Sequence, residues 1–338
     1  MSVLIIAEAG VNHNGDLGIA KELIAGAKDC GADVVKFQTW VTEELLHASA
    51  PKALYQKEND KSSSQFEMLK KLELSFDAFQ ELKEYATKLR IKFMSTPDEE
   101  KSLNFLVDSL QMETIKVGSG EVLNLPYLKK VGEKKKEVIL STGMASLGEV
   151  ERAYYTLLES GAVKVSLLHC TSAYPAPYDS VNLKAMLTLK EAFKTDVGYS
   201  DHTRGNEVSI AAVALGATII EKHFTLNSKM EGPDHQASSN PQEFADLVRQ
   251  IRNVELAISG DGIKRPQGIE LETKKIVSKG IYAARDLEAH AIISMDDLKF
   301  LRPQHNGLAA ENYELIIGKE VQKPLKKGQE IALSNISL

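Results

Sequence analysis

The sequence has little of what marks a secreted, membrane-spanning or disulfide-rich protein. Cys30 and Cys170 are the only cysteines in 338 residues, so we expect no disulfide framework and a location in the reducing cytoplasm. The longest apolar runs are far shorter than the roughly 20 residues of a membrane span. The chain begins Met1-Ser-Val-Leu-Ile-Ile, which carries no cationic segment and leads directly into a strand pattern, so no secretion signal is expected.

An excess of positive charge is also missing. With 41 Lys+Arg against 47 Asp+Glu, the formal net charge is −6, which argues against nucleic acid as the main partner. An anionic substrate is not excluded, because one pocket can concentrate positive charge locally. The composition is otherwise that of a globular protein, with 43% hydrophobic and 26% charged residues.

The sequence does contain strand patterns that alternate with helix patterns through roughly the first 260 residues. Strands are predicted near 3–7, 33–37, 92–94, 114–117, 138–140, 164–168, 196–198 and 218–220. Helices are predicted after Asp16 and near 76–89, 126–131, 147–159, 183–192, 207–214 and 241–258, and a long polar loop over 55–65. Eight strands alternating with helices favour an α/β fold of the TIM type, a parallel (β/α)8 barrel. The alternative is a doubly wound open sheet.

The alternation of strand and helix patterns ends after Ile258, which divides the chain into parts. We predict a barrel domain over 1–260, a polar linker over 261–279 and a small, strand-poor module over 280–338. A module of about sixty residues buries only a modest core on its own. It is therefore expected to dock onto another subunit.

Polar residues stand at nearly every predicted strand end. In a parallel barrel these ends converge on one rim, where active sites are built. One polar strand end usually only caps a helix or completes a turn, whereas a full set is harder to explain in that way. The residues in question are Glu8, Lys36, Gln38, Ser95, Thr96, Lys116, Ser119, Glu121, Ser141, Thr142, His169, Ser200, His202, Glu221 and His223.

Two of these residues could bind a metal ion. His202 and His223 come from consecutive strand ends, where neutral imidazoles can ligate a divalent ion and leave positions open for water and substrate. Two histidines completed by oxygen ligands would suit Mn²⁺ or a similar ion better than a closed zinc site. The alternative is that both rings are only hydrogen-bonded within the rim.

Other strand-end residues suit a small phosphorylated acid. Lys36 and Lys116 supply positive charge, hydroxyl groups follow, and the glycine turns 118–120 and 141–143 let backbone amides approach an anion. Alternatively, the glycines only make tight loops. Glu121 lies beside the first turn, where it could act as a general base or orient water, although an exposed loop glutamate would look the same.

The motifs together resemble the bacterial sialic acid synthase family, which includes N-acetylneuraminate synthases and the related legionaminate and pseudaminate synthases. They are Ala7-Glu-Ala-Gly-Val-Asn-His-Asn-Gly15, Val35-Lys-Phe-Gln-Thr39, Lys116-Val-Gly-Ser-Gly-Glu121, Ser141-Thr-Gly-Met144, His169-Cys-Thr-Ser-Ala-Tyr-Pro175, Tyr199-Ser-Asp-His-Thr203, Glu221-Lys-His-Phe-Thr225 and Gly232-Pro-Asp-His235. The resemblance covers essentially the whole chain. It implies a TIM-type barrel followed by an antifreeze-like (SAF) domain, in a domain-swapped homodimer.

The resemblance also implies roles for single residues. By position, His202 and His223 match Mn²⁺ ligands, and Lys36 and Thr96 match residues that hold the carboxylate of phosphoenolpyruvate. The positions that match its phosphate site are Lys116, Ser119, Ser141 and Ser200. The positions around the sugar and metal are Glu8, Gln38, Tyr174 and Asp234, with Ser172 as a further binding residue. Glu121, Glu8 and Lys116 are the candidate catalytic residues.

Arg302 resembles an arginine that reaches from the C-terminal domain into the partner's site and contacts the N-acyl group of the sugar. Two positions depart from the family pattern. Asp98 stands in Ser95-Thr-Pro-Asp98 where the family commonly has phenylalanine, and the stretch after Arg302-Pro303 is one residue longer than usual.

The implied reaction joins phosphoenolpyruvate to an N-acylated mannosamine-type sugar and water, giving a nonulosonic acid and phosphate. The sugar is N-acetylmannosamine, giving N-acetylneuraminate, or 2,4-diacetamido-2,4,6-trideoxymannose, giving legionaminate. One alternative is another phosphoenolpyruvate condensation with a sugar phosphate, which would need an extra cationic site that the strand ends do not offer. The other is a non-catalytic carbohydrate-binding protein. No nucleic acid or membrane is expected as a partner.

Overall fold

The computed structural model describes residues 2–52 and 62–337, and the chain divides into two compact units, Met1–Ser259 and Gly260–Leu338. The first unit holds an eight-stranded parallel sheet in the order β3-β2-β1-β8-β7-β6-β5-β4. Its strands are β1 (Leu4–Gly10), β2 (Val34–Thr39), β3 (Lys92–Pro97), β4 (Thr114–Val117), β5 (Glu137–Ser141), β6 (Lys164–Cys170), β7 (Val197–Asp201) and β8 (Ile219–His223).

The strand order is that of a barrel. The first strand, β1, pairs in parallel with both β2 and the last strand, β8. The two ends of the order, β3 and β4, lie beside each other without a hydrogen-bonded ladder. The predicted TIM-type barrel is therefore confirmed, and the open doubly wound sheet is wrong for this chain.

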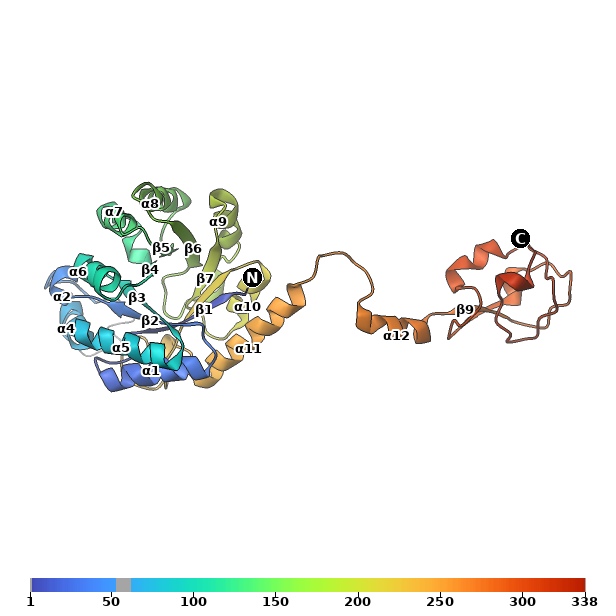
Figure 1. Ribbon diagram of the computed structural model, residues 1–338, viewed down its shortest axis with the longest axis horizontal. Helices are drawn as coiled ribbons and strands as arrows, with labels where there is room; N and C mark the ends of the chain where they lie inside the picture. The colour runs from blue at the N-terminus through green and yellow to red at the C-terminus, as the bar shows by residue number, and fades with distance from the viewer. Residues whose placement is uncertain (1, 53–61, 338) are drawn as a thin grey trace. The chain divides into compact units, whose positions relative to one another are not determined.

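Helices surround the strands of the first unit (Figure 1). They are α1 (Leu17–Asp29), α2 (Thr42–Leu45), α4 (Gln65–Leu72), α5 (Phe76–Leu89), α6 (Glu100–Asn104), α7 (Leu125–Glu133), α8 (Leu147–Glu159), α9 (Ala185–Phe193), α10 (Glu207–Ala214) and α11 (Pro241–Ile258). Short turns of helix are η1 (Phe105–Ser109), η2 (Ser119–Glu121), η3 (Tyr178–Ser180) and η4 (His235–Ala237). None of the helices in the described part of the chain is long and apolar enough to cross a membrane.

Helix α1 shows how local sequence sets an element. The Asp16 side chain accepts a hydrogen bond from the backbone N–H of Ile19 (2.9 Å), which caps the helix as predicted. Four apolar side chains three or four residues apart then face the strands and are fully buried, namely Ala20, Leu23, Ile24 and Ala27.

Three short helices, α2, α4 and α6, escaped the sequence analysis. Helix α4 begins at Gln65, the end of the predicted polar loop 55–65, of which residues 55–61 lie outside the described part. Its Met68 and Leu72 pack with Val11 and Trp40 in a small cluster of their own. Two buried residues in eight give too weak a periodic signal to predict a helix among so many polar side chains.

The second unit is small and poor in strands. Strand β9 (Gly280–Ala283) pairs antiparallel with β10 (Leu298–Leu301), and the remaining links are isolated bridges and the turns η5 (Met295–Asp297), η6 (Ala310–Leu315) and η7 (Leu333–Asn335). Its core includes Ile281, Leu287, Ile316, Val321 and Ile331. The stretch predicted as a polar linker is not all irregular, because it contains helix α12 (Gly268–Val277), none of whose residues is buried.

Candidate active site

A pocket of about 460 Å³ lies at the carboxyl ends of the barrel strands. Each of the eight strands contributes at least one side chain to its lining, as expected for a parallel barrel. The lining residues with polar side chains include Glu8, Lys36, Gln38, Thr96, Asp98, Lys116, Ser119, Glu121, Ser141, Ser172, Tyr174, Ser200, His202, Glu221, His223 and Asp234. All the residues to which the family resemblance gives a role, except Arg302, therefore meet in one cavity.

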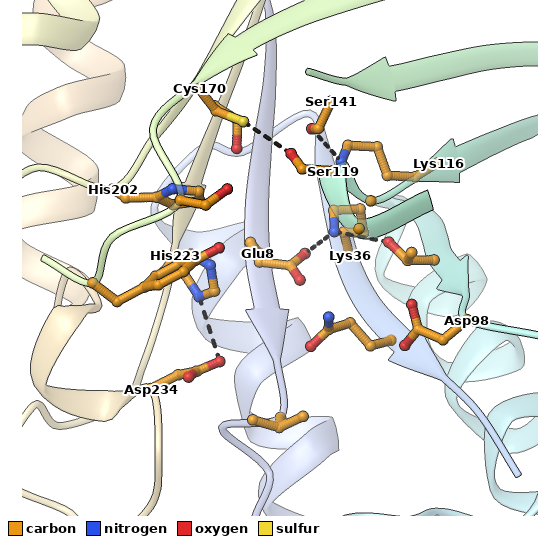
Figure 2. Close-up of a pocket in the computed structure, with 18 of the residues that line it drawn as sticks. Glu8, Lys36, Asp98, Lys116, Ser119, Ser141, Cys170, His202, His223 and Asp234 are labelled. Atoms are coloured by element: carbon orange, nitrogen blue, oxygen red, sulfur yellow. Dashed lines mark hydrogen bonds and ion pairs between the residues drawn. The ribbon is translucent and has the colours of Figure 1, made fainter. Parts of the chain in front are cut away.

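Two buried lysines form the cationic part of this pocket. Lys36 on β2 pairs with Glu8 on β1 and donates to the Thr96 hydroxyl on β3 (3.1 Å). Lys116 on β4 donates to the Ser141 hydroxyl on β5 (2.7 Å). Figure 2 shows both lysines directed into the same space, from β2 and β4, the strands on either side of β3.

Glu221 on β8 lies between the two lysines. Its Oε2 is 3.6 Å from the Lys36 Nζ, and its Oε1 is 3.4 Å from the Lys116 Nζ. Ser200 donates a hydrogen bond to the same carboxylate (2.9 Å). The sequence analysis noted Glu221 only as a strand-end residue, whereas the structure makes it the common partner of both cations.

The four charges of this cluster titrate differently. Burial raises the pKa of Glu8 to about 8, although Lys36 opposes the shift. Burial alone would also raise the pKa of Glu221, but Lys116 and Lys36 outweigh it and lower this pKa to about 2. Burial lowers the pKa of Lys116, while Glu221 and Glu8 raise that of Lys36 against the effect of burial. With Glu8 protonated at neutral pH, the cluster carries a net positive charge that suits an anion.

Hydroxyl and thiol groups border the lysines. The Ser119 hydroxyl accepts a hydrogen bond from the Gly143 N–H (2.9 Å) and lies 3.2 Å from the Cys170 sulfur. A Cβ atom on Gly143 would come within 2.4 Å of the Ser172 oxygen, so a side chain has no room there. Gly118 and Gly120 have open space instead, so packing does not require glycine at these two positions.

His202 and His223 lie edge to face on the same side of the pocket, with ring centroids 5.5 Å apart and the Tyr174 ring centroid 4.2 Å from that of His202. The Nδ1 of His202 donates to the Thr171 carbonyl oxygen (2.7 Å), which leaves Nε2 for a ligand. The Nδ1 of His223 is buried without a hydrogen bond. Burial lowers the pKa of both rings, in His223 with a further contribution from His202, so both are neutral, as metal ligands must be.

These histidines fit a metal site that is open rather than closed. The described residues contain no group of three or more His, Cys, Asp or Glu side chains arranged to hold a metal ion. The protein therefore offers two nitrogens, and water or substrate would supply the remaining ligands. Asp234 lies 3.9 Å from the His223 Nδ1, and burial raises its pKa to about 6.

A hydrogen-bonded loop places Asp234 in the pocket. The side-chain N–H of Asn12, just after β1, donates to the Phe224 carbonyl oxygen (2.9 Å) and to the Ser238 hydroxyl (2.8 Å). Ser238 in turn donates to the backbone oxygen of Asp234 (2.7 Å). On the other side of the loop, fully buried His235 is hydrogen-bonded to Thr225 (2.7 Å).

Three strand-end residues predicted for the rim do not line the pocket, because each forms a hydrogen bond with a residue outside it. Ser95 is hydrogen-bonded to Thr39 (2.7 Å), Thr142 donates to the Leu168 carbonyl oxygen (2.9 Å), and His169 is bonded to the Val181 carbonyl oxygen (2.7 Å). For these three, the explanation by local hydrogen bonding is the right one.

The predicted site residues Glu121 and Arg302 belong to different units of the chain. Glu121, in η2, lines the pocket and accepts a hydrogen bond from the Asn124 side chain (2.7 Å). Arg302 follows β10 in the second unit and is exposed, while every residue lining this pocket belongs to the first unit.

The sequence analysis gave no site role to Asp98 or Cys170, although both line the pocket. Burial raises the pKa of Asp98 to about 7, with Lys36 opposing and Glu121 adding to the shift. The position of Cys170 at the end of β6, between polar neighbours, could have indicated that it lines the site. Asp98 could have been identified as a charged residue directly after a buried strand.

The fold and the pocket together define a parallel α/β barrel with a buried, cationic small-molecule site at the carboxyl ends of its strands. Residues 23–264 match the model of the NeuB family, and residues 278–337 match that of the SAF domain. The chain therefore belongs to the NeuB family, and the resemblance seen in its motifs is confirmed.

Individual relatives agree with this assignment. The chain is 50% identical over 331 residues to an N,N'-diacetyllegionaminic acid synthase of Campylobacter jejuni, covering 97% of this chain and 98% of the relative. It is 47% identical over 341 residues to the enzyme of that name from Legionella pneumophila, covering 99% and 95%. The crystal structure of an N-acetylneuraminic acid synthetase from Leptospira borgpetersenii superposes with a TM-score of 0.72 at 36% identity, covering 81% of this chain and 90% of that one.

Proposed function

We propose that this protein condenses phosphoenolpyruvate with an N-acylated mannosamine-type sugar and water, giving a nonulosonic acid and inorganic phosphate. The observation that carries the proposal is the division of the pocket. Lys36 and Lys116 lie buried on one side, and a pair of neutral histidines with Asp234 lies on the other. The first side suits a small dianionic or trianionic acid, and the second suits an uncharged sugar.

The acid would be held by lysine and hydroxyl groups that already form hydrogen bonds in the pocket. Lys36 and Thr96 lie together and would bind the carboxylate. Lys116 and the neighbouring hydroxyls of Ser119, Ser141 and Ser200 would bind the phosphate. The anion would replace part of the attraction that Glu221 now exerts on the lysines, and protonated Glu8 would not repel the anion.

The sugar would lie against the opposite side. A divalent ion such as Mn²⁺, held by His202 and His223, would polarise the sugar aldehyde. Gln38, Tyr174 and Asp234 line this region and can hydrogen-bond hydroxyl and amide groups. Holding the enol carbon of phosphoenolpyruvate beside the aldehyde carbon contributes to the rate through proximity.

The remaining steps need an activated water. After the new C–C bond forms, positive charge develops on the carbon that bears the phosphate ester, and water adds there. Glu121, oriented by Asn124, would position this water and accept its proton. Cleavage of the C–O bond then releases phosphate and leaves the keto group of the product.

Two further assignments belong to the same proposal. Arg302 of the partner subunit would contact the N-acyl group of the sugar in a domain-swapped homodimer. For the sugar itself, two relatives of 50% and 47% identity carry the name N,N'-diacetyllegionaminic acid synthase, which favours 2,4-diacetamido-2,4,6-trideoxymannose over N-acetylmannosamine.

The acidic residues of the pocket argue against a sugar phosphate as acceptor. Asp98, Glu121 and Asp234 all line the pocket, and the only lysines or arginines lining it among the described residues are Lys36 and Lys116. A second phosphate would find no cation of its own.

The test is phosphate release by the purified protein with Mn²⁺. Release should require both phosphoenolpyruvate and an N-acylated mannosamine, and should be faster with 2,4-diacetamido-2,4,6-trideoxymannose than with N-acetylmannosamine. Release from phosphoenolpyruvate alone, or none with any sugar of this class, would contradict the proposal.

A further inference from the structure

Asp98 lines the pocket but has no part in the chemistry proposed above. It directly follows β3, two residues beyond Thr96. Its backbone N–H donates to the Thr39 carbonyl oxygen (3.0 Å), and the Tyr127 hydroxyl donates to the carbonyl oxygen of the preceding Pro97 (2.6 Å). The backbone is thus held from β2 on one side and from α7 on the other, so the barrel itself fixes where the side chain begins.

The Asp98 carboxylate has no hydrogen-bond or ion-pair partner among the described residues. The residue is partly exposed, and its carboxylate oxygens remain accessible from the pocket. A ligand that fills the pocket would displace water from this carboxylate, at a cost that donors on the ligand can offset.

A metal ion does not fit this carboxylate. The two histidines that could ligate a cation come from β7 and β8, whereas Asp98 follows β3. Figure 2 shows Asp98 on the opposite side of Glu8 from His202 and His223.

The acidic substrate does not fit either. In its ionised form, Asp98 adds a second anion beside Lys36 and repels the phosphate and carboxylate of such a substrate, which have no proton to donate to it near neutral pH. An uncharged sugar carries hydroxyl and amide N–H donors, which are what an ionised carboxylate accepts. Of the two organic substrates of the proposed reaction, only the sugar offers such donors to Asp98.

We propose that Asp98 is a sugar-binding residue that determines which acceptor is used, its carboxylate accepting a hydrogen bond from a hydroxyl or acylamino N–H of the sugar. The inference rests on the proposed function, because it requires a sugar in this pocket. A buried acceptor rejects an analogue that lacks the donor far more strongly than an apolar pocket rejects one extra group. Sugars with a methyl or O-methyl group at that position should therefore be poor substrates.

The test compares Asp98→Asn and Asp98→Ala with the wild type, using Asp29→Asn, an exposed aspartate at the end of α1, as the matched control. We expect the KM for the sugar to rise about tenfold or more in both Asp98 variants. The KM and the calorimetric Kd for phosphoenolpyruvate should change less than about twofold, which also shows that the variants are folded. Discrimination against sugars lacking the donor should fall by a similar factor.

An unchanged KM for the sugar in both variants would overturn the role of Asp98 while leaving the condensation itself intact. A KM for phosphoenolpyruvate that rises as much as that for the sugar would place Asp98 with the acid and overturn it as well. Absence of phosphate release by the wild type with every sugar would overturn the proposed function, and this inference with it.

Discussion

Lys222 donates a hydrogen bond to Asp201 Oδ2 across 2.8 Å, and both side chains are buried. The two residues are register partners on β8 and β7, and each directly precedes one of the pocket histidines, His223 and His202. Ser209 of α10 donates to the same aspartate oxygen (2.6 Å). The ion pair therefore faces the helix layer and fixes the register of the two strands whose next residues enter the pocket.

Replacing Lys222 should test this ion pair. Lys222→Met leaves Asp201 charged and buried without its cation, which typically costs about 3 kcal/mol or more of the free energy of unfolding. Urea unfolding followed by circular dichroism measures the loss. The exposed pair of Lys194 and Glu191 gives the matched control, because Lys194→Met should cost less than about 1 kcal/mol. Equal midpoints for the two variants would show that the buried pair does not stabilise the barrel.

Removing one histidine should abolish metal binding without unfolding the protein. His202→Ala deletes one of two nitrogen donors, so the Kd for Mn²⁺ should rise at least about tenfold, while the far-ultraviolet circular dichroism spectrum stays the same. His47→Ala changes an exposed histidine and serves as control. Undiminished Mn²⁺ binding by His202→Ala in calorimetry would remove this residue from the metal site.

Asn12 should affect the sugar rather than the acid. Asn12→Ala removes the hydrogen bonds from Asn12 to Phe224 and Ser238, and thereby loosens the loop that carries Asp234. We expect the KM for the sugar to rise about tenfold, with little change in the Kd for phosphoenolpyruvate. Asn227→Ala, at an exposed asparagine of the same loop whose side chain accepts a hydrogen bond from the nearby Lys229 N–H (3.0 Å), should leave both unchanged. Equal losses for sugar and acid would indicate a general structural role for Asn12.

Binding of the acid should weaken above about pH 8. Because the pKa of Glu8 is raised in the folded protein, the side chain is neutral below this pH and leaves Lys36 available to an anion. Above this pH, an increasing fraction of Glu8 is ionised and repels the bound anion. The Kd for phosphoenolpyruvate should therefore rise by up to about tenfold per pH unit. Calorimetry from about pH 6.5 to about pH 9.5 covers roughly 1.5 units on either side of the Glu8 pKa. It should show this rise in Kd in the wild type and not in Glu8→Gln. The same pH dependence in both proteins would assign it to another group.

The sequence predicted the barrel because its elements have strong periodic signals. Helices α5, α8 and α11 have the predicted bounds, since each repeats apolar residues at a helical period over at least two turns. Helix α10 also has the predicted bounds, although its apolar residues are not confined to one face. Helix α12 has no buried residue, and α4 has a short apolar face. Neither could be told from a polar loop by pattern alone.

The site was predictable as a rim but not side chain by side chain. Where two polar residues are consecutive, as in Ser95-Thr96 or Ser141-Thr142, their side chains point to opposite sides of the strand, so only one of them can line the pocket. The backbone register determines which residue this is, and here Thr96 and Ser141 line the pocket. The bridging position of Glu221 likewise depends on β8 closing against β1, which no local pattern encodes.

The proposed condensation cleaves the C–O bond of phosphoenolpyruvate, and the reaction run in ¹⁸O-labelled water distinguishes this cleavage from hydrolysis at phosphorus. With Mn²⁺, phosphoenolpyruvate and 2,4-diacetamido-2,4,6-trideoxymannose, mass spectrometry should find a single product with the mass of both substrates plus water less phosphoric acid. The released phosphate should carry no label, because the water adds to carbon. Labelled phosphate together with pyruvate would instead show simple hydrolysis at phosphorus and would contradict the account.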